Sequence, residues 1–431
     1  MLDDVRPIQK NPQTDKPLDG SVLPKAGKAI GPVPIASVFN TVPGADSGPA
    51  PIVNGKPVPD GKSNNFWKLR WSMNHLQTFI FVGTAIILVG GAVAATALSR
   101  PPQIGGVHLS KRPPKPAPKI TTVPNTLTGL QVDASVNQRP VTGVMVENSA
   151  DARPQSGLDQ AGVVFEAIAE GGVTRFLALF QDTQPDYIGP VRSARPYYVQ
   201  WCMGFDCALA HAGGSPEALQ NIRDWGTKDL NDTPGIFWRI NSRYSPHNLY
   251  TSTAKLNELE SGRGYATPTF TGFARKSDQP FKSATPAKDA RVKSAPETRT
   301  AANGIDFAIS SGIYNAHFDY DAKTNGYHRS QGGAPHMTVN SAGAQAQISP
   351  KVVIGIVTSY GIAADKHSQY GVIGSGQAYI FQDGTVATGT WSKTDITGPL
   401  KFTDATGKDI PLNAGQTWVT ALAAANLISY Q

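Results

Sequence analysis

A stretch of twenty residues without a charged side chain, residues 79–98, sets the strongest constraint on this chain. A helix rises about 1.5 Å per residue, so twenty residues span about 30 Å, the thickness of the hydrocarbon core of a bilayer. Trp67 and Trp71 precede the stretch and Arg100 follows it, as at membrane interfaces. We therefore expect one transmembrane helix over residues 76–98. The alternatives are a buried core helix and a cleaved signal peptide, and the 75 preceding residues disfavour the signal peptide.

The net charge of +7 is carried outside the expected globular part of the chain. Residues 1–75 are rich in Pro and Gly, with 9 basic and 6 acidic side chains, and we expect a disordered tail. Residues 99–124 are a Pro/Lys-rich stalk with 5 basic and no acidic side chains, and its positive charge could contact anionic lipid of the bilayer or a cell-wall polymer. Residues 125–431 hold 25 basic and 26 acidic side chains. Because a nucleic-acid-binding surface needs excess positive charge on the folded part, we expect no nucleic-acid partner.

Short apolar runs broken by turn residues divide the globular part into two lobes. In residues 125–272, VTGVMVEN, GVVFEAIAE and TRFLALFQ are typical of buried strands, and SARPYYVQWCM and SPEALQNIRDWG are typical of helices that begin at a serine. In residues 303–431 apolar and polar side chains alternate, with Asp383-Gly384 as a hairpin turn. Residues 273–302 are polar and contain prolines, as in a linker. The expected fold class is mixed α/β: a two-lobed ectodomain, with an α/β N-lobe and a β-rich C-lobe, behind one transmembrane helix.

The two cysteines, Cys202 and Cys207, match no zinc-binding pattern. A short disulfide bond in an oxidising compartment and a pair of buried free thiols both remain open.

The C-lobe also contains histidines and aspartates that match no metal-ligand spacing: His317, Asp319, Asp321, His328 and His336. We therefore expect no metal and no cofactor.

An ordered series of motifs in both lobes resembles one bacterial family. The N-lobe contains ENSADARPQSGLDQAGVVFEAIAEGGVTRFLALF, IGPVRSARPYY, AHAGGSPEAL and RYSPHNLYT, and the C-lobe contains GYHRSQGGAPH, GSGQAYIFQDGTVATGTWSK and PLNAGQTWV. Over residues 124–431 the series is similar to the YerB-like lipoprotein family, which is built from a domain of unknown function. The resemblance implies an exported, membrane-anchored protein, with the N-terminus cytoplasmic and both lobes extracytoplasmic, and it implies no reaction. Charges around the expected helix do not decide this orientation. The chain differs from the family in its anchor, a transmembrane helix in place of a lipidated N-terminal cysteine.

The basic side chains of the N-lobe are mostly arginines, 9 against 2 lysines, whereas the C-lobe has one arginine, Arg329, and 6 lysines. Arginine binds carboxylate or phosphate with a rigid pair of N–H donors. Arg192 and Arg195 flank the expected first turn of a helix, where free N–H groups favour an anion. The alternatives are internal ion pairs and scattered surface charges. The expected ligand-binding residues are Arg153, Arg175, Arg192, Ser193, Arg195, Gly213, Gly214, Ser215, Arg243, His247 and Asn248.

Three side chains are candidates for catalysis. His211 ends an apolar run, where site residues often lie in mixed α/β sheets, and Glu166 and Glu170 are candidates for an acid/base pair. Four residues along a strand separate the two carboxylates by about 13 Å, too far for a direct pair unless the following Gly turn folds one back. The alternative is that one of them neutralises Arg175 or Arg192. The chain has no Walker A, GxSxG or HExxH motif.

We expect an extracytoplasmic, membrane-anchored cell-envelope protein that binds an anionic or glycan cell-wall ligand through the Arg-rich N-lobe. One alternative is a hydrolase of an envelope polymer that uses His211 with Glu170 or Glu166. A second alternative is a scaffold that recruits other envelope proteins.

Overall fold

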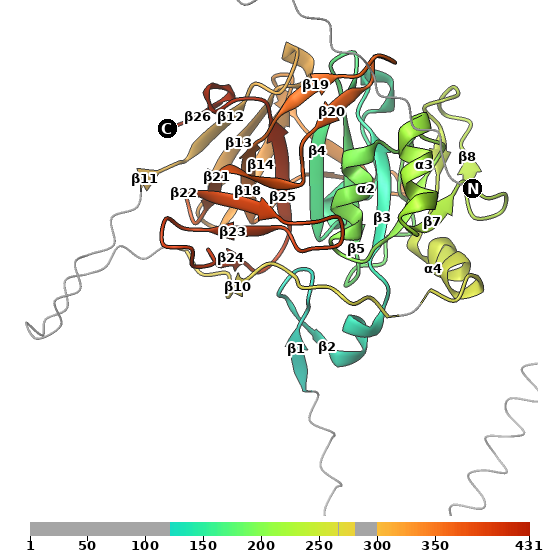
Figure 1. The fold of residues 1–431 in the computed structure, drawn as a ribbon, viewed down its shortest axis with the longest axis horizontal. Helices are drawn as coiled ribbons and strands as arrows, with labels where there is room; N and C mark the ends of the chain where they lie inside the picture. Colours follow the sequence, from blue (N-terminus) through green and yellow to red (C-terminus); the bar gives the residue numbers. More distant parts are fainter. Residues whose placement is uncertain (1–120, 266, 281–299) are drawn as a thin grey trace, which may run out of the picture. The chain divides into compact units, whose positions relative to one another are not determined.

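The computed structural model describes residues 121–265, 267–280 and 300–431. Its main element is a sheet of 11 strands to which both predicted lobes contribute (Figure 1). In spatial order the path is β11 (Thr300–Ala301), β22 (Thr385–Lys393), β21 (Gly374–Gln382), β18 (Val352–Val357), β25 (Thr417–Leu422), β4 (Val163–Glu170), β5 (Val173–Phe180), β3 (Thr142–Glu147), β6 (Ala208–His211) and β7 (Lys228–Asn231). β23 (Lys401–Thr403) pairs with β22 beside this path.

The two predicted lobes meet in the middle of this sheet. β25 of the C-lobe pairs in parallel with β4 of the N-lobe, with Trp418 opposite Val164. Every residue of β25 is buried, as is every residue of β4 except Glu170. Strands that are buried on both faces have continuous runs of apolar residues in their sequence, rather than alternating apolar and polar residues. The buried apolar side chains of the two regions accordingly form one hydrophobic core.

Three α-helices are described: α2 (Pro196–Met203), α3 (Pro216–Asp224) and α4 (Thr253–Gly262). α3 begins as predicted, because the Ser215 side chain accepts a hydrogen bond from the Ala218 N–H. α2 begins later than the predicted start at Ser193, and Arg195 is its extended N-cap residue. A residue before proline avoids the helical conformation, so Pro196 fixes the first position of α2.

A second sheet of five strands lies on the opposite face of the main sheet from α2. Its order is β15 (Ala334–Pro335), β14 (Gly326–Gln331), β13 (Ala316–Asp321), β12 (Gly304–Phe307) and β26 (Ile428–Tyr430). Neighbouring residues of β4 point to opposite faces. Phe165 stacks on Trp201 of α2, while Glu166 bonds Arg329 of β14. The central sheet is therefore covered on both sides at this point.

Five two-stranded pairs complete the described strands. They are β1 (Thr122–Pro124) with β2 (Gln131–Asp133), β8 (Trp238–Arg239) with β9 (Leu249–Tyr250), β10 (Arg275–Lys276) with β24 (Leu412–Asn413), β16 (Met337–Val339) with β17 (Gln345–Gln347), and β19 (Tyr360–Ile362) with β20 (Ser368–Tyr370).

The structure tests several predictions about turns, cysteines and the linker. The Asp383-Gly384 hairpin turn is confirmed between β21 and β22, with φ of 60° and 69° at these two residues. Cys202 and Cys207 form a disulfide bond between α2 and β6. In the predicted linker, β10 pairs with β24, while residues 281–299 lie outside the described residues. The predicted tail, transmembrane helix and most of the stalk, residues 1–120, also lie outside them.

Candidate functional site

The carboxyl ends of three strands meet at one edge of the main sheet. β3 and β4 both run antiparallel to β5, and β6 runs parallel to β3, so Glu147, Glu170 and His211 lie at that edge. The segment 188–195 crosses the edge and is held there by backbone bonds, among them Arg192 N–H to the Met145 carbonyl. Because open α/β sheets bind ligands beyond the carboxyl ends of their strands, this edge is where a site is expected.

Glu170 accepts hydrogen bonds from the guanidinium groups of both Arg175 and Arg195. The two arginine side chains are only 3% and 4% exposed, whereas Glu170 is 35% exposed. Arg175 also donates to the Ser193 carbonyl at 3.0 Å, which holds segment 188–195 on the sheet. This geometry favours the internal-pairing alternative for Arg175 and Arg195, and it leaves the Ser193 side chain without a capping role.

Glu147 is the buried centre of a second group at the same edge. Its Oε1 lies 3.4 Å from Arg192 Nε and 2.9 Å from His247 Nδ1, and it accepts a 2.9 Å hydrogen bond from the Ser149 hydroxyl. The Arg192 side chain is 24% exposed and that of Glu147 is 3% exposed. Arg192 and His247 are therefore brought together by a carboxylate that the sequence analysis did not single out.

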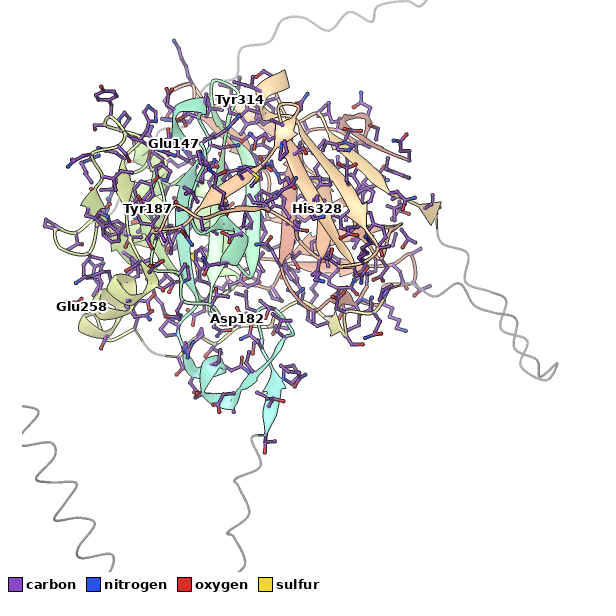
Figure 2. The ribbon with its side chains drawn as sticks, turned by 180° about the vertical axis from the view of Figure 1, so that it is seen from behind. Glu147, Asp182, Tyr187, Glu258, Tyr314 and His328 are labelled. Atoms are coloured by element: carbon purple, nitrogen blue, oxygen red, sulfur yellow. A yellow bond between two sulfur atoms is a disulfide. The ribbon has the colours of Figure 1, made fainter. Side chains whose placement is uncertain are left out.

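Arg153 differs from the other arginines of this edge, because its partners are neutral. Its Nε and Nη2 donate to the side-chain and backbone oxygens of Asn148, at 3.2 and 3.0 Å, and its guanidinium lies 5.2 Å from the centre of the Tyr314 ring. Among the described residues Arg153 has no carboxylate within ion-pair distance, and its Nη1 makes no hydrogen bond. Tyr314 and Glu147 lie toward the same end of the described part of the chain (Figure 2).

Arg243 supports the segment that carries Arg153. Its guanidinium donates to the carbonyl oxygens of Ala152 and Pro154, which flank Arg153 in the sequence. Asn248 is buried in the same loop, where it accepts from Arg239 and donates to the carbonyls of Ile240 and Arg243. These two predicted site residues therefore fix the loop that holds Arg153.

Arg153 lines a cavity of about 330 Å³ between the two lobes. Small-molecule sites typically have volumes of about 300–1,000 Å³. The lining residues are Arg153, Pro154, Gln331, Ala334, Pro335, His336, Met337 and Gln345.

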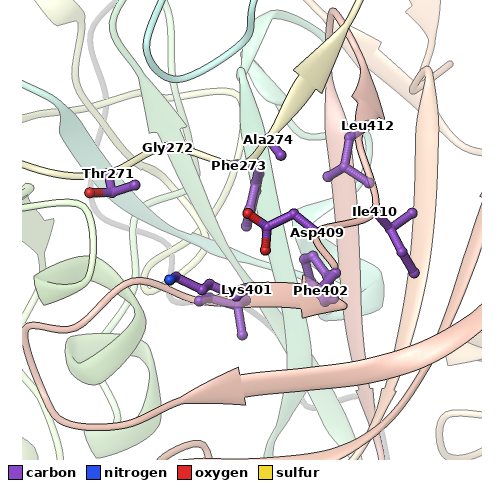
Figure 3. A pocket seen from close by; sticks show the side chains of 10 residues that line it. Thr271, Gly272, Phe273, Ala274, Lys401, Phe402, Asp409, Ile410 and Leu412 are labelled. Atoms are coloured by element: carbon purple, nitrogen blue, oxygen red, sulfur yellow. The ribbon is translucent and has the colours of Figure 1, made fainter. Parts of the chain in front are cut away.

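Two other cavities lie in the C-lobe region. One of about 80 Å³ lies between Phe273 and Phe402 (Figure 3), and this volume holds only a few waters at about 30 Å³ each. Another of about 390 Å³ is lined by Lys276 and Lys408 among others, and Lys276 is paired with Asp383. Neither cavity includes a predicted site residue.

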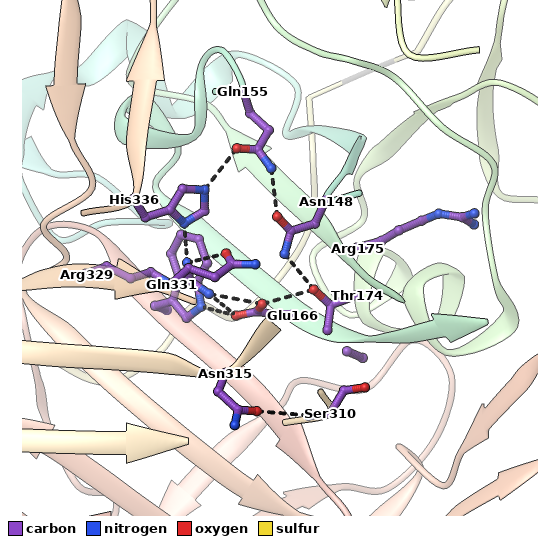
Figure 4. A network of polar contacts seen from close by, with 12 residues as sticks. Asn148, Gln155, Glu166, Thr174, Arg175, Ser310, Asn315, Arg329, Gln331 and His336 are labelled. Atoms are coloured by element: carbon purple, nitrogen blue, oxygen red, sulfur yellow. Dashed lines mark hydrogen bonds and ion pairs between the residues drawn. The ribbon is translucent and has the colours of Figure 1, made fainter. Parts of the chain in front are cut away.

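A buried polar network joins Glu166, Arg329 and His336 (Figure 4), and His336 also lines the Arg153 cavity. Arg329 donates to both oxygens of Glu166, at 3.1 and 2.9 Å, and both side chains are 0% exposed. Trp418 Nε1 donates to the same carboxylate at 3.0 Å, and Thr174 at 3.3 Å. Glu166 is therefore fully engaged inside the protein.

His336 closes this network on the side of the cavity. An arginine side chain can only donate hydrogen bonds. The hydrogen bond that Arg329 donates to Nδ1 of His336 therefore makes Nδ1 an acceptor. Nε2–H then donates to Gln155 Oε1 at 2.9 Å. Burial, together with the positive charges of Arg329 and Arg153, lowers the pKa of His336 well below its ordinary value. The ring is therefore neutral and both of its nitrogens are occupied.

The geometry gives no support to the predicted catalytic residues. His211 is 1% exposed, and its nitrogens face the Gly213 carbonyl at 2.7 Å and Asp229 at 2.9 Å. Both ring nitrogens therefore face protein oxygens, and the buried ring is not accessible to a substrate. Glu166 is enclosed beside Arg329, and Glu170, which is partly exposed, is paired with two arginines. The sequence alternative that a glutamate neutralises Arg175 is confirmed for Glu170.

The glycine turn after His211 has a structural role in this geometry. Gly213 adopts a φ of 68°, which favours glycine, and its carbonyl accepts from the Ala194 N–H. Gly214 approaches Leu219 of α3, and Ser215 caps that helix. The turn thus connects β6 to α3 and holds segment 188–195.

The described residues contain no group of three or more His, Cys, Asp or Glu side chains that could hold a metal ion. His317 instead bonds Asp306 and Asp319 on the outer face of the second sheet, at 2.7 and 3.0 Å. His336 belongs to the cavity wall.

Several residues of this region had no predicted role: Glu147, Asn148, Gln155, Tyr314, Gln331 and Trp418. Glu147 and Asn148 occur in the ENSADARP motif, next to Arg153, and adjacency was the one available signal. Arg329 stands out in the sequence only as the one arginine of the C-lobe.

The fold and this site define a strand-rich protein in which two regions of the chain share one sheet. Residues 127–266 match the N-terminal domain, and residues 305–419 the C-terminal domain, of a family described as protein of unknown function (DUF3048). The chain belongs to this family.

Two comparisons with proteins of Bacillus subtilis support this family assignment. A protein of strain 168 described as "Putative lipoprotein YerB" is 31% identical over 299 residues, which cover 68% of this chain and 84% of that protein. The crystal structure of YerB protein matches with a TM-score of 0.61 and 28% identity, over 72% of this chain and 99% of that chain. The resemblance to YerB-like proteins is confirmed.

The relative corrects the location that the sequence predicted. We expected a single-pass membrane protein with a cytoplasmic N-terminus and extracytoplasmic lobes, whereas the relative is described as a lipoprotein. A lipoprotein is attached to a membrane by lipid rather than by a spanning helix. The predicted location is therefore contradicted. Residues 76–98 are not among those the structure describes, and no helix that it does describe is long and apolar enough to span a bilayer.

Proposed function

We propose that this protein binds an anionic group of a cell-envelope ligand, such as peptidoglycan or a phosphate-bearing polymer, at the cavity lined by Arg153. One observation carries the proposal. Among the described residues, Arg153 lines a ligand-sized cavity without a carboxylate partner, whereas its neighbours Arg175, Arg192 and Arg195 each pair with a glutamate.

The energetics of Arg153 support this choice. Burial is the main cause that lowers the pKa of Arg153 below its ordinary value. A partly buried cation without a counter-ion raises the free energy of the empty protein, and a bound anion offsets that cost. Arg192 lies at the same edge and is partly exposed, so it is the second arginine available to a longer anionic ligand.

The position between the lobes also supports binding, because ligand sites are frequent at domain interfaces. In this proposal the mixed α/β N-lobe supplies Arg153 and Pro154, and the β-rich C-lobe supplies the remaining wall. An envelope ligand is suggested by the lipoprotein description of the relative and by the Cys202–Cys207 disulfide, since disulfides persist in oxidising compartments.

Neither alternative function has equal support. A hydrolase needs an accessible and unpaired acid or base. His211 and Glu166 are buried beside fixed partners, and Glu170 is paired with two arginines. A scaffold role would explain the paired arginines as internal supports. It explains neither the cavity nor Arg153, which has no carboxylate partner among the described residues.

Retention of the full-length protein on envelope polymers tests the proposal. The probes are purified peptidoglycan sacculi and a wall polymer with phosphodiester groups, in co-sedimentation at low and physiological salt. We expect Arg153→Ala to reduce retention at least tenfold with little change in melting temperature. Arg223→Ala removes an exposed arginine of α3 and is the matched control. Retention of Arg153→Ala equal to that of the unmodified protein on both polymers would contradict the proposal.

A further inference from the structure

The Arg153 cavity offers a single positive charge to a ligand. Among the described residues that line the cavity, Arg153 is the one basic side chain apart from His336, which is neutral and has both nitrogens occupied. Asn148 accepts hydrogen bonds from two of the three guanidinium nitrogens, Nε and Nη2. The group is therefore held in a fixed orientation, in which Nη1 makes no hydrogen bond among the described residues. A monoanion is matched by one guanidinium, whereas a phosphate dianion is better matched by several cations.

The rest of the lining is mostly apolar. Pro154, Ala334, Pro335 and Met337 provide aliphatic walls, and the two amides, Gln331 and Gln345, provide the neutral polar groups. Gln331 is already engaged, because its oxygen accepts from Arg329 at 2.7 Å. A polyhydroxylated sugar requires many donors and acceptors, since each of its buried hydroxyls needs a partner. The walls therefore favour a ligand with small apolar groups next to its negative charge.

An open strand edge lies beside the cavity. β17, which begins at the lining residue Gln345, pairs with β16, and it has no strand on its other side among the described residues. Gln345 and Ala346 are exposed. β16 is enclosed instead, since Val339 N–H donates to the Gln155 carbonyl on its far side. An open edge binds an extended peptide through its backbone hydrogen bonds, and pockets beside it select the side chains.

We infer that the cavity binds the C-terminal carboxylate of a short peptide, with the carboxylate on Arg153 and the peptide backbone along β17. Small aliphatic side chains of the last residues contact Pro154, Pro335 and Met337. This inference rests on the proposed function and names the chemical class of its ligand.

A pair of probes isolates the carboxylate. N-acetyl-Ala-Ala as the free acid and the same peptide as its C-terminal amide differ in charge and hardly in size. Calorimetric titration of the full-length protein should give binding of the acid and at least tenfold weaker binding of the amide. Arg153→Gln should reduce binding of the acid at least tenfold, and Arg223→Gln should leave it unchanged.

A second variant tests the cavity without touching its charge. Ala334 is exposed at the cavity wall, so Ala334→Trp should fold normally and fill the space next to Arg153. We expect loss of peptide binding with an unchanged melting temperature. Unchanged binding in this variant overturns the inferred location.

The possible failures are distinguishable. Equal binding of acid and amide overturns the carboxylate inference. If neither peptide binds while retention on envelope polymers still depends on Arg153, the peptide inference fails and the proposed function stands. If retention on the polymers is also independent of Arg153, both fail.

Discussion

Glu166 and Arg329 form an ion pair of 2.9 Å in which both side chains are fully buried. They are 163 residues apart in the sequence and lie on β4 and β14. The pair therefore joins the two predicted lobes at a point where water is excluded, directly behind the wall that carries His336.

Breaking this pair should destabilise the protein strongly. Arg329→Met leaves the Glu166 carboxylate buried without its cation, and we expect a loss of about 3–5 kcal/mol in the free energy of unfolding. Urea denaturation followed by tryptophan fluorescence measures it. The double variant Glu166→Leu with Arg329→Met removes both charges and should lose less than Arg329→Met alone. Lys255→Ala, at an exposed ion pair of α4, is the control and should have almost no effect.

A pH dependence is expected from Glu260 of α4, which is 1% exposed. Burial raises the pKa of Glu260 from 4.5 to about 7, although a hydrogen bond from Thr142 opposes this increase. Between these values the folded protein holds a proton that the unfolded chain has released. The free energy of unfolding should therefore fall as pH rises from about 4.5 to 7, by about 3 kcal/mol in total, and stay level above.

Glu260→Gln provides the comparison for this effect, because the amide does not titrate. We expect its free energy of unfolding to exceed that of the unmodified protein at pH 8 and to be similar at pH 4.5. Glu258→Gln changes an exposed carboxylate of the same helix and should leave the slope unchanged. A pH profile of Glu260→Gln parallel to that of the unmodified protein would show that another group is responsible.

Local sequence signals predicted the parts of the fold that depend on neighbouring residues. The apolar runs 162–170 and 174–181 correspond to β4 and β5, and Ser215 caps α3. The start of α2 was predicted too early, because the effect of Pro196 on the residue before it was stronger than the capping tendency of Ser193.

Contacts between distant residues decided the site and could not be predicted in this way. Gln155 and His336 are 181 residues apart, and their hydrogen bond depends on the register of both sheets. Arg153 was among the expected ligand-binding residues, but nothing local distinguished it from Arg175 or Arg195. The difference arises because the β4–β5 hairpin brings Glu170 to Arg175, while Arg153 meets the neutral Asn148.

The Cys202–Cys207 disulfide should stabilise the connection between α2 and β6. It closes a short loop, with a sequence separation of 5, and both cysteines are buried. The chain-entropy relation gives a contribution of about 2 kcal/mol for so short a loop. Replacing both cysteines with serine should lower the melting temperature, and a reductant should lower that of the unmodified protein but not that of the variant. Equal melting temperatures with and without reductant would indicate that the two thiols are not joined.

Arg195 and Arg192 should differ in their effect on stability. Arg195 is 4% exposed and shares Glu170 with Arg175, so Arg195→Ala removes a charged hydrogen bond from the interior and should cost about 2 kcal/mol. Arg192 is 24% exposed and its Nε is 3.4 Å from Glu147, a weak contact, so Arg192→Ala should cost less than about 1 kcal/mol. Thermal and urea denaturation of the two variants, with Arg223→Ala as the exposed control, measure the difference. Similar losses of stability in the two variants would mean that Arg192 also has a structural role. No loss of stability in Arg195→Ala would make Arg195 a candidate for ligand binding again.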